Sequence, residues 1–90
     1  MISGGINTNK HVWEYVKKDI QRILNKEGII DLFGRPYFRF GRSLLKKQEK
    51  HEGGKIPREE IQHLLENYIK KGLDEKILKR IIGLTVGSYP

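Results

Sequence analysis

Residues 35–50 (RPYFRFGRSLLKKQEK) carry the side chains with the clearest chemical potential in this chain. They hold six Lys or Arg residues against one acidic residue, Glu49, a local balance of +5. If the stretch is helical, four of these cations lie on one side of the helix over about 16 Å, because they recur at spacings of four, three and four. They are Arg35, Arg39, Arg42 and Lys46. Such a row suits several successive phosphates, and the planar arginine fork suits phosphate and guanine. The predicted nucleic-acid-binding residues, for DNA or RNA, are Arg35, Arg39, Arg42, Lys46, Lys47 and Lys50.

Two backbone conformations compete at the start of this stretch, and only the helix produces the row. In a strand, Tyr37 and Arg39 would face one way and Phe38 and Phe40 the other. On an exposed sheet the rings would be free to stack on unpaired bases. In a helix, Tyr37 and Phe40 share a core-facing side opposite the arginines. The periodicity favours the helix, with Tyr37 and Phe40 as core residues.

Pro36 and Gly41 are the two residues of this stretch that helix interiors usually exclude. Proline is favoured in the first turn, because its missing N–H would have no partner there anyway. Glycine inside a helix costs about 1 kcal/mol relative to alanine. Close approach of another helix would explain why Gly41 is present.

No constellation of residues points to catalysis or to a bound metal or cofactor. The three histidines lack metal-ligand spacing on one helix, and the chain contains no cysteine. The serines have no nucleophile-elbow context, and the Gly-Gly-Lys at residues 53–55 lacks the spacing of a phosphate loop. We therefore expect a protein that is not an enzyme and needs no cofactor.

A protein-interaction surface is the alternative to nucleic-acid binding. A small helical bundle can present a groove to a partner helix, or it can pair as a homodimer. Trp13 and Tyr15 are the candidate interaction residues, because an exposed aromatic side chain suggests a binding hot spot.

The first helix is predicted over residues 9–27, after a flexible lead at residues 1–8. Apolar residues between Val12 and Leu24 recur at spacings of three and four. Asn9 is suited to accept hydrogen bonds from the first amides of the helix, and Gly28 is suited to end it in the left-handed conformation. Residues 9–90 are then expected to form one helical domain.

A short apolar connector is predicted at residues 29–34 (IIDLFG). Its length is too small for periodicity to distinguish a helical turn from an extended segment. In either case its large apolar side chains, among them Leu32 and Phe33, are expected largely in the core. Arg35 precedes a proline and is therefore expected outside the helical region.

The last third of the chain reads as two helices joined at Gly72. The first is predicted over residues 57–71 and the second over residues 74–82, with Asp74 as N-cap and Gly83 at the end. Both carry an apolar stripe at helical spacing.

Size and charge place these elements in one small basic domain. Ninety residues with a net charge of +7 suggest a single domain with anionic partners. No apolar run is long enough for a membrane span, and the first ten residues do not resemble a secretion signal, so we expect a cytoplasmic protein. The predicted fold is an all-α bundle of four helices, at about residues 9–27, 36–50, 57–71 and 74–82.

Overall fold

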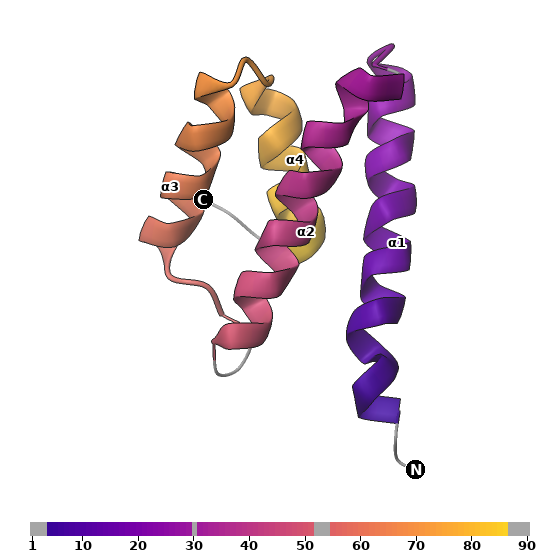
Figure 1. Ribbon diagram of the computed structural model, residues 1–90, viewed down its shortest axis with the longest axis vertical. Helices are drawn as coiled ribbons and strands as arrows, with labels where there is room; N and C mark the ends of the chain where they lie inside the picture. The colour runs from indigo at the N-terminus through magenta and orange to yellow at the C-terminus, as the bar shows by residue number, and fades with distance from the viewer. Residues whose placement is uncertain (1–3, 30, 52–54, 87–90) are drawn as a thin grey trace.

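Helix α2 (Arg35–Lys50) is the central element of the fold, and every other helix packs against it (Figure 1). The computed structural model describes residues 4–29, 31–51 and 55–86. Within these ranges every element is helical and none is a strand, which confirms the predicted all-α class with four α-helices. The other elements are α1 (Gly4–Lys26), the 3-10 helix η1 (Asp31–Gly34), α3 (Arg58–Lys70) and α4 (Glu75–Val86).

The arrangement places α1 and α3 on either side of α2, with α4 packed across α2 behind them (Figure 1). In the described part of the chain, no helix is both long enough and apolar enough to cross a bilayer.

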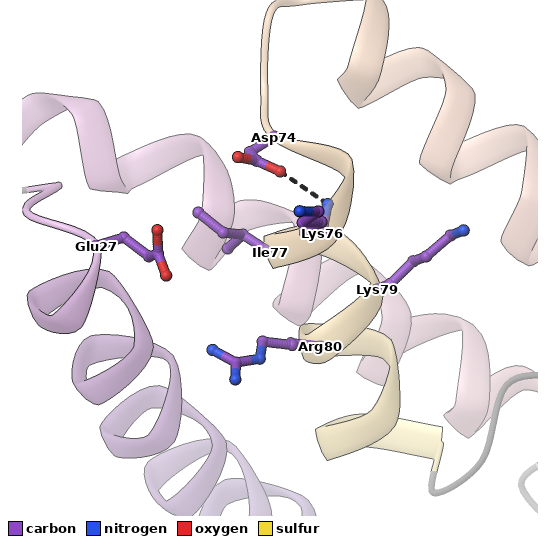
Figure 2. A pocket seen from close by; sticks show the side chains of 6 residues that line it. All are labelled: Glu27, Asp74, Lys76, Ile77, Lys79 and Arg80. Carbon is purple, nitrogen blue, oxygen red and sulfur yellow. Dashed lines mark hydrogen bonds between the residues drawn. The ribbon is translucent and has the colours of Figure 1, made fainter.

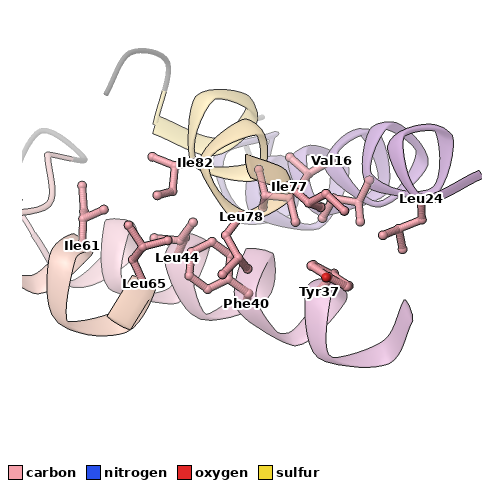
Figure 3. Close-up of a cluster of buried hydrophobic side chains, with 12 residues drawn as sticks. Val16, Leu24, Tyr37, Phe40, Leu44, Ile61, Leu65, Ile77, Leu78 and Ile82 are labelled. Carbon is pink, nitrogen blue, oxygen red and sulfur yellow. The ribbon is translucent and has the colours of Figure 1, made fainter. Parts of the chain in front are cut away.

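The core forms where the apolar side of α2 meets the other three helices (Figure 3). Tyr37, Phe40 and Leu44 of α2 are buried, as the helical period predicts, and the Phe40 ring meets the Tyr68 ring edge-on at 5.1 Å. The residues after Pro36 therefore form the helix that the periodicity predicts, and the strand alternative is wrong. The core residues from the other helices are Val16, Ile20, Leu24, Ile61, Leu65, Ile77, Leu78, Ile81 and Ile82.

Gly41 lies at the point where α1 and α4 both approach α2. A Cβ atom at Gly41 would lie 2.7 Å from Cδ1 of Ile20 and 3.3 Å from Cγ2 of Ile81. Both distances are shorter than ordinary van der Waals contact. The glycine therefore allows three helices to pack closely, which accounts for its place inside a helix.

The helix ends follow local sequence rules. Gly28 and Gly72 have φ angles of 75° and 98°, the left-handed conformation that glycine adopts without a steric penalty. Both were expected to end helices, and both do so. The Asp74 carboxylate accepts a hydrogen bond of 2.8 Å from the Lys76 N–H, which confirms Asp74 as the N-cap of α4. The Asp74 N–H donates to the Tyr37 hydroxyl at 2.9 Å, tying this cap to α2.

Helix α1 begins at Gly4, five residues before the predicted start, so Asn9 lies inside the helix and is not its N-cap. Glycine is tolerated in a first turn, because the first four amides of a helix have no intrahelical partner. The predicted flexible lead at residues 1–8 therefore overlaps α1. Residues 1–3 lie outside the described residues.

Helix α4 continues through Gly83 to Val86, so the predicted end at residue 82 is wrong. The buried Thr85 explains the extension: its hydroxyl donates to the Ile81 and Ile82 carbonyls, 3.1 Å from each. The Gln48 side chain also donates to the Thr85 carbonyl at 3.3 Å. Contacts with α2 and the hydroxyl bonds outweigh the weak helix propensity of glycine.

Replacing Gly83 by alanine is expected to stabilise the protein by about 0.5–1 kcal/mol, because alanine favours the helix. A Cβ atom at Gly83 would meet no atom within 4 Å, so no clash offsets this gain. Thermal unfolding checks the prediction, with an expected rise in Tm of about 2–8 °C. A lower Tm would show that α4 does not form a regular helix through residue 83.

The connector differs most from expectation. Leu32 and Phe33 are 65% and 78% exposed, so their predicted place in the core is wrong. In a 3-10 helix of about three residues per turn, the buried Gly34 takes the inward side, and the two preceding residues face outward. A Cβ atom at Gly34 would lie 3.0 Å from Cδ1 of Leu24. Arg35 is the first residue of α2 and does not lie outside the helix as expected. Ile30 lies outside the described residues.

Candidate nucleic-acid interface

The outer side of α2 carries four exposed cations in line, which we call the cationic row: Arg35, Arg39, Arg42 and Lys46. At about 100° per residue they fall within a narrow sector of the helix, opposite the buried Tyr37, Phe40 and Leu44. Lys50, also exposed, continues this side at the end of α2.

No carboxylate of the described residues forms an ion pair with any member of the cationic row or with Lys50. This contrasts with other lysines of the same chain. Lys79 lies 3.0 Å from the Glu75 carboxylate on its own helix. The positive charge of the row is therefore presented to solvent without local compensation from the described carboxylates.

Lys47 does not join the row. It is half-buried and turned toward α3, where its Nζ lies 3.3 Å from Oε1 of Glu60. The other oxygen of Glu60 lies 2.9 Å from Nε2 of His51. Of the six predicted binding residues, the structure thus groups five on the outer side of α2 and directs Lys47 to an internal contact.

Trp13 lies in the interface between α1 and α2. It is half-buried, and its ring approaches the Cβ position of Gly41 at 3.8 Å. The Arg42 guanidinium lies over the same ring, 6.0 Å from its centroid, within reach of a cation–π interaction. Trp13 therefore supports Arg42 at the edge of the row.

Tyr15 is 73% exposed, but it does not share a surface with Trp13. Residues two positions apart on a helix point about 200° apart. The two predicted interaction residues therefore do not form one patch.

A groove runs between α1 and α2 beside the row, which we call the α1–α2 groove. It has a volume of about 390 Å³ and is lined by Lys17, Lys18, Gln21 and Phe38. Lys17 lies 3.8 Å from the Glu14 carboxylate, and both side chains are about half exposed, so this pair is weak. Lys17 and Lys18 therefore bring two further cations to this groove. Sequence reasoning missed them because α1 mixes charges of both signs.

A second hollow opens at η1, which we call the η1 hollow. It has a volume of about 570 Å³ and is lined mainly by apolar residues of three segments. The exposed Leu32 and Phe33 form one wall, and Lys71 is the charged lining residue. A short apolar run gives no signal that distinguishes a buried segment from an exposed one, so the sequence does not reveal this surface. The other lining residues are Gly28, Ile29, Pro36, Tyr37, Gly72 and Leu73.

The hollow between the end of α1 and α4 is chemically different (Figure 2). It has a volume of about 430 Å³, and the side chains of Glu27 and Arg80 extend into the space between the two helices. The Asp74 carboxylate here is engaged in capping α4. Because carboxylates stand among the cations, this surface is less suited to a polyanion than the outer side of α2.

Among the described side chains, no group of three or more His, Cys, Asp or Glu residues is placed to hold a metal ion. Comparisons with known protein families, with curated proteins and with solved structures give no match to this chain.

Proposed function

We propose that this protein binds nucleic acid through the cationic row of α2, as an accessory protein without chemistry of its own. The observation that carries the proposal is the row itself: four exposed cations on one side of a helix, without an ion-pair partner among the described carboxylates. Cations that bind phosphates release condensed counterions, and this release supplies most sequence-independent affinity.

The spacing of the row also fits a phosphate backbone. Its ends are separated by about 16 Å along α2, a length over which a nucleic-acid strand presents several phosphates. Contacts of this kind position a protein on the backbone and carry no sequence information. We therefore expect binding to DNA and to RNA with little dependence on sequence.

Fluorescence anisotropy of labelled DNA and RNA oligonucleotides at low salt tests the proposal. We expect saturable binding to both, weakening steeply as salt is added. Absence of binding to either nucleic acid at low salt would refute the proposal outright.

The η1 hollow supports a second candidate function, binding of a protein partner. Leu32 and Phe33 are large, exposed and adjacent, and exposed apolar surface beside a hollow often marks an interaction site. We propose that the occupant is an acidic protein segment that inserts an apolar side chain. Lys71 lines the hollow, and the net charge of +7 disfavours a second copy of the same chain.

The variant Leu32→Ser/Phe33→Ser tests this second candidate with an amphipathic peptide of Glu and Leu as the probe. We expect the unaltered protein to bind the peptide and the variant to bind it at least about tenfold more weakly. Tyr15→Ser is the control, since it removes an exposed aromatic side chain from α1. Equal binding by all three proteins would contradict the candidate. Self-association of the unaltered protein, seen as concentration-dependent sedimentation and lost in Leu32→Ser/Phe33→Ser, would also contradict it. The occupant of the hollow would then be a second copy of the chain.

A further inference from the structure

The α1–α2 groove lies beside the cationic row and indicates which class of nucleic acid the proposed interface binds. Resting on the proposed function, we propose that this groove accepts an unpaired base of a single-stranded nucleic acid. The base stacks on Phe38, while the cationic row holds the neighbouring phosphates. Single strands are then preferred to duplexes.

Phe38 is the aromatic residue of the RPYFRFGR stretch that remains available for a ligand. Tyr37 and Phe40 are 5% and 0% exposed and are committed to the core. Phe38 packs against the edge of the core but stays half-buried, and it lines the groove. A partly exposed ring beside cations is the arrangement by which many proteins bind single strands.

The position of Phe38 on α2 links the ring to the row. Arg35 precedes it by three residues and Arg42 follows it by four, so both are its surface neighbours on the helix, about 5–6 Å apart between Cβ atoms. Both arginines are exposed and have no carboxylate partner among the described residues. A base on Phe38 would therefore have a guanidinium on either side for its two flanking phosphates.

The opposite wall comes from α1 and is compatible with a base. The stems of Lys17 and Lys18 supply apolar surface, and their ammonium groups add positive charge. Gln21 also lines this wall, and its side-chain amide donates to the Asn25 side chain at 3.0 Å. Bases inside a duplex are stacked on one another and cannot enter this space without unstacking.

Three probes of equal length test the inference: single-stranded oligo-dT, a mixed-sequence duplex, and an abasic single strand with the same backbone. We expect the unaltered protein to bind oligo-dT about tenfold more tightly than either other probe, the size of a base–aromatic stack. Phe38→Leu keeps an apolar side chain but removes the π face. This variant should bind oligo-dT only as tightly as it binds the abasic strand. Its affinities for the abasic strand and for the duplex should equal those of the unaltered protein.

Tyr15→Leu is the matched control, because Tyr15 is an exposed aromatic residue that does not line the groove. It should leave all three affinities unchanged. Equal affinity of the unaltered protein for oligo-dT and for the abasic strand overturns the groove inference, and it does so even if Phe38→Leu fails to fold. Binding to all three probes without discrimination leaves the proposed function standing and refutes only the groove. Absence of binding to all three refutes both.

Discussion

The double variant Arg39→Glu/Arg42→Glu is expected to bind nucleic acid at least about 100-fold more weakly than the unaltered protein at about 50 mM salt. Each phosphate contact contributes close to a factor of ten in affinity at that salt concentration, through counterion release. Losing two contacts gives the factor of 100, and the two introduced carboxylates add repulsion. Both side chains are exposed and lack ion-pair partners among the described carboxylates, so the change should leave the helical content intact. Anisotropy titration gives the affinity, and circular dichroism checks the fold.

The control Arg58→Glu/Lys76→Glu separates a local effect from a change in total charge. It lowers the net charge from +7 to +3, as the first variant does, since each substitution removes two charges. Arg58 and Lys76 are exposed and lie in the first turns of α3 and α4, where a carboxylate is favourable. We expect this control to lose only a small part of the affinity. Equal losses in the two variants would show that binding follows net charge and does not depend on the row.

Gly41→Val is expected to destabilise the protein by about 2–3 kcal/mol. Even the Cβ atom would lie within 2.7 Å of Ile20 and 3.3 Å of Ile81, and valine adds two further carbon atoms. Ile20 and Ile81 are fully buried and have little room to move. The Tm should fall by about 10–20 °C for a domain of this size.

Gly83→Ala is expected to raise the Tm, the opposite of the effect of Gly41→Val. Gly83 is also a glycine within a helix, but no atom lies within 4 Å of the added carbon there. The two substitutions together test whether local space decides the sign of the effect. A Tm for Gly41→Val equal to or above that of the unaltered protein would contradict the close packing of α1, α2 and α4.

Much of the fold is predictable because each helix has an apolar face with the helical period. The spacing of Tyr37, Phe40 and Leu44 identifies the buried side of α2, and it therefore also identifies the exposed side that carries the row. Gly28 and Gly72 mark helix ends because the left-handed conformation strongly favours glycine. These rules act within a few residues along the chain, which is why sequence alone reveals them.

The features that sequence reasoning misses depend on tertiary contacts. Lys47, one of the predicted phosphate-binding residues, is instead paired with Glu60, which lies thirteen residues away in the sequence but beside it in the fold. Helix α4 passes Gly83 because Thr85 packs in the core and bonds back to the preceding turn. The outward orientation of Leu32 and Phe33 follows from the 3-10 geometry of η1, and composition does not encode it.

The salt dependence of binding tests the central claim most directly, because its slope counts the phosphates that the protein neutralises. For a row of four cations on duplex DNA, a plot of log affinity against log salt concentration should have a slope between about −3 and −4. A slope flatter than about −1, or no measurable binding at low salt, would contradict the claim that the exposed cations of α2 bind the phosphate backbone.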